Sequence, residues 1–136
     1  MAVPNNWNDE IIKEFRANGG TVKAFAKQPL LLLRTTGAKS GAERVNPLAY
    51  LKRDDTLYVF ASFNARPINP AWYHNLKAHP KVTVEVGTET FEAVATEVLG
   101  AERDDVYAEQ AAFNPGFAEY EKKTTRVIPV IALTRA

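Results

Sequence analysis

The sequence predicts a mainly β fold in which an antiparallel sheet curls into a small barrel, with short helices inserted between the strands. Three observations support this class. Segments with a strand pattern recur from residue 30 onward, and residues 82–86 alternate valine with Thr83 and Glu85. Turn pairs at Asp54-Asp55 and Gly87-Thr88 separate several of these segments by tight hairpins. Crossover helices do not alternate with the strands, which argues against a parallel α/β sheet.

The first 28 residues predict a helical extension ahead of the barrel. Asn8 is placed to cap a helix whose apolar side includes Ile11, and Asn18-Gly19-Gly20 is typical of a helix end. A second short helical piece is expected over residues 21–27, because Pro29 breaks the helical pattern.

From residue 29 on, the pattern predicts about six strands and two helical insertions. The strands are expected over Leu30–Thr36, Arg44–Lys52, Thr56–Ser62, Lys81–Val86, Glu89–Leu99 and Arg126–Leu133. One helix is expected to start at Asn69-Pro70 and end at His79-Pro80; the other spans Glu102–Lys123 and is interrupted by Asn114-Pro115-Gly116. We therefore expect a single domain over residues 1–136, with the barrel over residues 29–136.

The composition limits the chemistry of the chain. With 136 residues and 46% hydrophobic content, it is long enough for one core and too short for two. No apolar stretch approaches the roughly 20 residues that cross a bilayer, and no cysteine is available for a disulfide or a thiolate ligand. We expect a cytoplasmic protein, in which any redox chemistry would require a bound cofactor. Peripheral attachment to the inner membrane face, through Lys13, Lys23 and Lys27 of the N-terminal segment, stays open.

Residues 36–47 form a basic turn bracketed by Gly37 and Gly41. Glycines let backbone N–H groups converge, while Lys39, Ser40 and Arg44 supply donors to an anion such as a phosphate. The alternative is a solvated hairpin tip.

Charge is distributed unevenly along the chain, although the net charge is only +1. Every charged residue within 34–53 is basic except Glu43. Every charged residue within 81–121 is acidic except Lys81 and Arg103. A nucleic-acid-binding protein would be basic overall, so we expect a small polyanionic ligand and no nucleic-acid partner. His74 and His79 lack acidic or cysteine partners at ligand spacing, so no metal site is expected.

Several ordered blocks resemble the deazaflavin-dependent nitroreductase and quinone reductase family. They are LLLLRTTGAKSGAERVNPLAYL from residue 30, FAS at 60–62, NPAWYHNLKAHPKV at 69–82 and TTRVIPVIAL at 124–133. The resemblance implies a split β-barrel of the flavin-reductase or FMN-binding type. It also implies reduced coenzyme F420, a deazaflavin with a phospholactyl oligoglutamate tail, as the cofactor.

The same resemblance implies the site residues. Lys39, Ser40 and Arg44 would hold the tail phosphate, Ser62 would polarise the acceptor carbonyl, and Tyr120 or solvent would supply a proton. The other implied cofactor-binding residues are Ala38, Val45, Asn46, Pro47, Leu48, Ala49, Phe60, Ala61, Ser62, Phe63, Ala71, Trp72, Tyr73, Asn75 and Phe117.

The chain also departs from the nitroreductase members of this family. Phe63 replaces a phosphate-directed lysine, and Ala49, Asn114 and Phe117 replace tyrosines around the hydride acceptor. We therefore expect a roomier, less polar acceptor pocket, and a reductase that passes hydride to an enone, a quinone or, with less support, a nitro compound. Two alternatives stay open: an FMN-dependent oxidoreductase on the same fold, and a non-catalytic deazaflavin-binding protein. The oligomeric state is not predicted.

Overall fold

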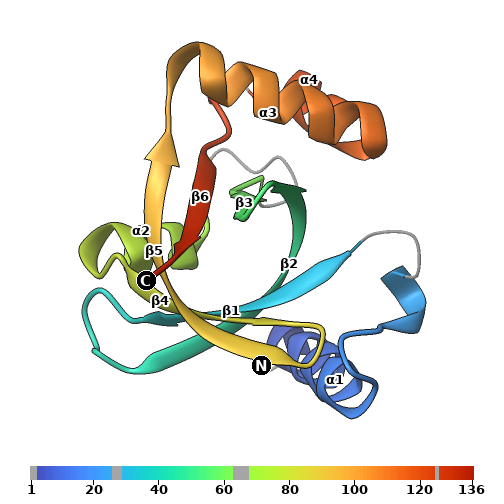
Figure 1. Cartoon of the computed structure of the whole chain (residues 1–136), viewed down its shortest axis with the longest axis vertical. Coiled ribbons are helices and arrows are strands. Elements are labelled where there is room, and N and C mark those ends of the chain that lie inside the picture. The colour runs from blue at the N-terminus through green and yellow to red at the C-terminus, as the bar shows by residue number, and fades with distance from the viewer. Residues whose placement is uncertain (1–2, 26–28, 63–67, 125) are drawn as a thin grey trace.

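The computed structural model describes residues 3–25, 29–62, 68–124 and 126–136, and its centre is a closed antiparallel barrel (Figure 1). The strands are β1 (Leu30–Thr36), β2 (Glu43–Arg53), β3 (Thr56–Phe60), β4 (Lys81–Val86), β5 (Glu89–Val98) and β6 (Val130–Arg135). They close in the order β1-β2-β3-β6-β5-β4. The antiparallel barrel predicted from the sequence is therefore confirmed.

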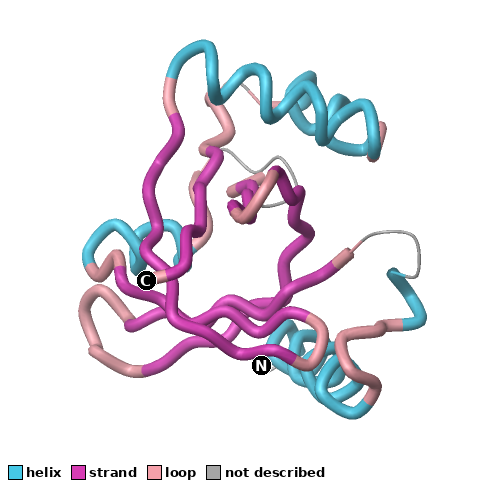
Figure 2. The backbone as a smooth tube through the Cα atoms, in the orientation of Figure 1, coloured by secondary structure: helices cyan, strands magenta, loops and turns pink. Residues whose placement is uncertain are grey.

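In the described part of the chain, four α-helices and one short 3-10 helix surround the barrel (Figure 2). They are α1 (Val3–Ala17), the 3-10 helix η1 (Lys23–Phe25), α2 (Ala71–Ala78), α3 (Gly100–Phe113) and α4 (Gly116–Lys123). Figure 1 shows α3 and α4 together on one side of the barrel and α1 on the opposite side. The barrel thus separates the two helical regions.

Strand β1 begins with four consecutive leucines because both of its faces are buried. Leu31 and Leu33 are fully buried in the barrel interior, whereas Leu32 packs on the outside against Phe15 of α1. Successive side chains of a strand point to opposite faces, so a strand that is covered on both faces needs no polar alternation. A further apolar cluster, which includes Phe60 and Tyr107, joins α3 and α4 to the barrel.

The starts of α1 and β6 differ most from the prediction. Helix α1 begins at Val3, ahead of the predicted cap Asn8, because Pro4 is tolerated in the first turn of a helix. Strand β6 begins at Val130 instead of Arg126: the Ile128 carbonyl accepts hydrogen bonds from the Arg103 side chain, and proline at position 129 has no N–H for a ladder.

Candidate functional site

A cleft of about 1160 Å³ runs from the β1–β2 turn past β2 and α2 to α4. It brings together most of the residues that the sequence predicted for a binding site. These are Ala38, Lys39, Ser40, Arg44, Asn46, Pro47, Leu48, Ala49, Phe60, Ser62, Ala71, Trp72, Asn75, Phe117 and Tyr120. Segments that are distant in the sequence therefore line one concave surface.

The β1–β2 turn closes on itself through backbone hydrogen bonds. The Gly37 N–H donates to the Ala42 carbonyl at 2.7 Å, and the Gly41 N–H donates to the Gly37 carbonyl at 3.0 Å. A Cβ atom at Gly37 would lie 2.6 Å from Ser40 Oγ, and Gly41 has a φ of +70°. A side chain at Gly37 would have to displace the Ser40 hydroxyl, and one at Gly41 would be strained, so glycine is favoured at both positions. The turn places Lys39 in the lining of the cleft.

Lys39 and Arg44 lack carboxylate partners within the described part of the chain. Five other arginines, at positions 16, 34, 53, 103 and 135, are ion-paired with aspartate or glutamate. The Arg44 side chain makes one long hydrogen bond, from Nη1 to the Glu43 carbonyl at 3.4 Å. The basic segment predicted from the sequence is thus partly neutralised, but two of its cations remain available to an anionic ligand in the cleft.

Asn75 of α2 lies under this turn and is 7% exposed. Its Oδ1 accepts a hydrogen bond from the Ala38 N–H at 3.0 Å, and its Nδ2 donates to Thr35 Oγ1 at 3.2 Å. The family resemblance implied that Asn75 binds the cofactor. In the structure it lines the cleft and also supports the backbone of the turn.

Aromatic side chains also line the cleft, from α2 beside the β1–β2 turn and from α4 at the opposite end. Trp72 of α2 is 5% exposed, and Phe117 of α4 is 7% exposed. The Phe117 ring makes edge contacts with Phe60 at 5.4 Å and with Tyr120 at 5.3 Å between ring centroids. This end of the cleft is suited to a planar, mostly apolar group, with the Tyr120 hydroxyl as a polar atom.

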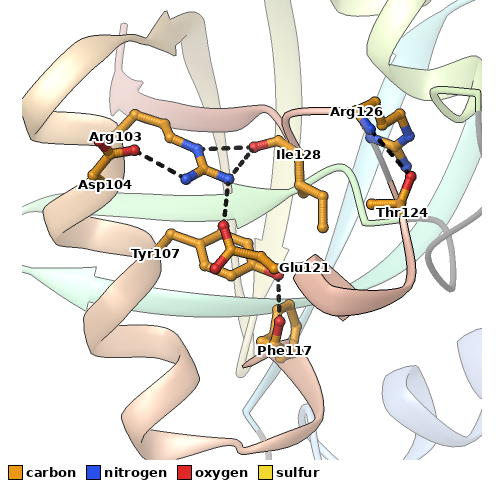
Figure 3. Close-up of polar contacts among 8 residues, drawn as sticks. All are labelled: Arg103, Asp104, Tyr107, Phe117, Glu121, Thr124, Arg126 and Ile128. Carbon is orange, nitrogen blue, oxygen red and sulfur yellow. Dashed lines mark hydrogen bonds and ion pairs between the residues drawn. The ribbon is translucent and has the colours of Figure 1, made fainter. Parts of the chain in front are cut away.

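A network of hydrogen bonds centred on Arg103 of α3 ties α4 to the barrel (Figure 3). Arg103 donates to the Ile128 carbonyl from both Nε and Nη2, and its Nη2 also lies 3.2 Å from Glu121 Oε2 on α4. The guanidinium covers the ring of Tyr107, whose hydroxyl donates to the Phe117 carbonyl at 2.6 Å. Burial raises the pKa of Tyr107, so its phenol stays protonated and remains a donor. The network thereby fixes the helix that carries Phe117.

Ser62 lies where β3 leaves the barrel, and its backbone is held by Arg126. The Ser62 carbonyl accepts a hydrogen bond from Arg126 Nη2 at 2.8 Å, and Arg126 Nη1 donates to Asn69 Oδ1 at 2.9 Å. Burial lowers the pKa of Arg126 below its ordinary value. Ser62 therefore presents its side chain to the cleft from an anchored backbone.

Four predicted site residues do not contribute to the described lining of the cleft. Val45 packs against the apolar cluster of α1, because it alternates with Arg44 on β2. Ala61 is fully buried in the barrel core. The Tyr73 hydroxyl donates to Glu97 of β5 at 2.8 Å. Burial is the main cause that raises the pKa of Tyr73 to about 12, and this hydrogen bond is the second. Phe63 lies outside the described residues.

The cleft also contains residues that were not predicted as binding residues. They are Ile11, Phe25, Leu30, Gly37, Pro70 and His74; Asn114 also lines the cleft and had been expected beside the hydride acceptor. No motif singles out Ile11, Phe25 or Leu30, because they read as ordinary core residues of a helical extension and a strand. His74 had been weighed only as a metal ligand. Among the described residues, no three histidine, aspartate or glutamate side chains gather as a metal site would require.

No helix in the described ranges has the length and apolarity needed to span a bilayer.

Comparison with known proteins identifies the family. The family model for F420H(2)-dependent quinone reductases matches residues 7–135. An F420H(2)-dependent quinone reductase of Mycobacterium tuberculosis is 38% identical over 110 residues, which cover 79% of this chain and 74% of that protein. The family predicted from the sequence blocks is therefore confirmed.

Solved structures support the same conclusion. An F420H2-dependent reductase, FDR-A, superposes with a TM-score of 0.71 at 38% identity, over 77% of this chain and 93% of that chain. A domain-swapped dimer superposes with a TM-score of 0.73 at 34% identity, over 96% of this chain and 98% of that chain. A pyridoxamine 5'-phosphate oxidase-like protein of Listeria innocua, at 10% identity and a TM-score of 0.58, shares the fold alone, which confirms the split-barrel class. The chain belongs to the F420H(2)-dependent quinone reductase family.

Proposed function

We propose that this protein is an F420H2-dependent reductase that passes hydride from the reduced deazaflavin to a quinone or a related conjugated acceptor. One observation carries the proposal: a single cleft joins the cations Lys39 and Arg44 to the aromatic walls at Trp72 and Phe117. A ligand that fills it needs an anionic end and a planar end. Coenzyme F420, with a tail phosphate and a flat ring system, has both.

The residues present fit this cofactor. At the turn, Lys39 and Arg44 would bind the tail phosphate as charge-assisted donors, with the Ser40 hydroxyl beside them. The Ser40 Oγ already accepts the Ala42 N–H at 3.1 Å, so its own hydrogen is directed outward as a donor. The deazaflavin ring would lie between β2, at residues 46–49, and Trp72.

When bound, reduced F420 supplies the hydride. The chain's own residues orient the acceptor and exclude water from it. The Ser62 hydroxyl would donate to the acceptor carbonyl, and the Tyr120 hydroxyl would hold the proton that the reduced acceptor takes up. Helix α4 supplies Phe117 and Tyr120 as an apolar cover over this end of the cleft.

The acceptor end favours quinones and enones over nitro compounds. Its lining includes Ala49, Phe117 and Asn114, where nitroreductase members of the resembled family carry tyrosines. Fewer hydroxyl donors leave a nitro group poorly solvated, whereas a quinone ring needs one donor at its carbonyl.

The test is a parallel titration of the purified protein with F420 and FMN, followed by a steady-state assay of F420H2 oxidation with a naphthoquinone. We expect F420 to bind more tightly than FMN and the quinone to be reduced. The Arg44→Ala variant is the matched control, because it should bind F420 more weakly at unchanged fold. Tight FMN binding without F420 binding would contradict the proposal, and F420 binding without turnover across an acceptor panel would make the protein a deazaflavin carrier.

A further inference from the structure

The β1–β2 turn that carries Lys39 is tied to the rest of the described chain by one hydrogen bond that leaves the turn. The Ala38 N–H donates to Asn75 Oδ1 of α2 at 3.0 Å. The turn's other hydrogen bonds, among Gly37, Ser40, Gly41 and Ala42, are internal. Asn75 therefore sets how the turn lies relative to α2, which also carries Trp72.

The other end of the Asn75 amide is held by a residue outside the cleft. Asn75 Nδ2 donates to Thr35 Oγ1 at 3.2 Å, and Thr35 is 2% exposed. Thr35 does not line the cleft, so it reaches a ligand only through other residues. In the β1–β2 register Thr35 is the direct partner of Arg44, and paired residues of antiparallel strands project to the same face.

We propose that Thr35 is a positioning residue for the anion end of the cleft. Its buried hydroxyl accepts the Asn75 amide N–H and so orients the amide oxygen toward the Ala38 N–H. That bond holds the turn in the conformation that presents Lys39. The proposal rests on the proposed function only in taking the tail phosphate of F420 as the anion.

The physical reason lies in the two ends of a buried amide. An asparagine amide has an acceptor end and a donor end of nearly equal size, and each end needs a partner when it is buried. Without the Thr35 hydroxyl, the Nδ2 end would face an apolar side chain and the amide would lose its preferred orientation. The Ala38 N–H would then open more often to solvent.

The experiment compares Thr35→Val, which removes the hydroxyl at similar size, with Thr35→Ser, which keeps it. Two quantities are measured: the amide hydrogen exchange rate of Ala38 by NMR without ligand, and the dissociation constants for F420 and for the deazaflavin nucleoside that lacks the phosphate tail. In Thr35→Val we expect about tenfold faster exchange and about tenfold weaker F420 binding, with the nucleoside changed less than about twofold. Thr35→Ser should stay within about twofold of wild type throughout.

A double-mutant cycle with Asn75→Ala tests whether Thr35 acts through the amide. In that background Thr35→Val should have no further effect on F420 affinity. Unchanged Ala38 exchange in Thr35→Val, equal losses for both ligands, or an equal loss in Thr35→Ser would overturn the proposal. If wild type binds no F420, the proposed function fails, and the Ala38 exchange rates of the two Thr35 variants still decide the positioning role.

Discussion

Arg44 lines the cleft, whereas Arg103 lies outside it and holds helix α4, and the surroundings of these two arginines differ. Arg44 is exposed on β2 and makes a single long bond to the Glu43 carbonyl. Arg103 is 8% exposed and bonds the Ile128 carbonyl, Asp104 and Glu121. A cation with unused donors suits ligand binding, whereas a buried cation with satisfied donors holds secondary structure together. Arg44 thus keeps donors available for an anionic ligand, whereas Arg103 uses its donors to fix helix α4.

The largest effect on stability is expected when the buried cation is removed. Arg103→Met should lower the free energy of unfolding by about 3 kcal/mol, because it leaves the Ile128 carbonyl and Glu121 without their donor. Urea unfolding measures the change. Arg103→Lys should recover part of it, since it keeps the charge but loses the planar fork. A loss below about 1 kcal/mol would show that Arg103 does not hold α4.

Removing an exposed cation should weaken ligand binding and leave the free energy of unfolding almost unchanged. Lys39→Ala and Arg44→Ala are each expected to weaken F420 binding by about 1.5–3 kcal/mol, the range for hydrogen bonds to charged groups. Each should change the free energy of unfolding by no more than about 0.5 kcal/mol. Calorimetric titration at two salt concentrations checks this, and added salt should weaken wild type more than either variant. Wild-type affinity in both folded variants would reduce the turn to a hairpin tip.

The acceptor end is tested by a change that leaves the ring packing of Phe117 in place but removes the hydrogen bond that Asn114 Oδ1 accepts from the Gly116 N–H at 3.1 Å. Asn114→Tyr adds a hydroxyl at a cleft residue and avoids Phe117, whose ring is packed against Phe60 and Tyr107. We expect the ratio of kcat/KM values to shift toward nitroaromatics by about tenfold, or ~1.4 kcal/mol. The matched control is Phe113→Tyr, at an exposed residue that does not line the cleft. The same shift in both variants would place the acceptor elsewhere.

The smallest effect is expected at a third group of charges, which joins α1 to the barrel. Arg16 bonds Glu85 with Nη2 at 2.6 Å from Oε2, and Arg34 Nε lies 3.2 Å from the same oxygen. The hydrogen bond from Arg16 is the main cause that lowers the pKa of Glu85 below its ordinary value of 4.5. Because the folded pKa is lowered, this stabilisation is present above pH 4.5 and is lost as the pH falls through the folded value.

Glu85→Gln should therefore lower the free energy of unfolding by about 1 kcal/mol at pH 7 and flatten its fall between about pH 5 and pH 3. F420 affinity should not change, because Glu85 does not line the cleft. Thermal unfolding across this pH range provides the measurement. An equal fall in wild type and variant would assign the acid sensitivity to other carboxylates.

Much of the fold followed from local pattern. Hydrophobic runs and turn pairs predicted all of the strands, and β1 and β4 have the predicted bounds. The errors arose where tertiary contacts override pattern. Val127 and Ile128 favour an extension of β6, but Pro129 cannot donate to the ladder and the Ile128 carbonyl is bonded to Arg103. A side-chain donor from a distant helix has no local signature.

The site was predictable to the extent that it follows from short motifs. The glycine turn and the NPAWYHN block placed Lys39, Arg44 and Trp72 among the candidate residues, and all three line the cleft. Charge counting along the chain could not show that Arg34 is neutralised while Arg44 is not, because the carboxylates that pair with Arg34 lie on two other strands. Thr35 carries no sequence signal either, since a threonine in a strand is ordinary.

The two helices of the acceptor end are inserted between strands that are already neighbours. Val98, the last residue of β5, pairs with Val130, the first residue of β6, so residues 99–129 leave and return to the same rung of the ladder. A tight turn between β5 and β6 would be enough to close the barrel at this point. Barrel closure therefore places little demand on the length or sequence of this excursion. Sequence changes within residues 99–129 can therefore alter this end of the cleft without shifting the register of β5 and β6.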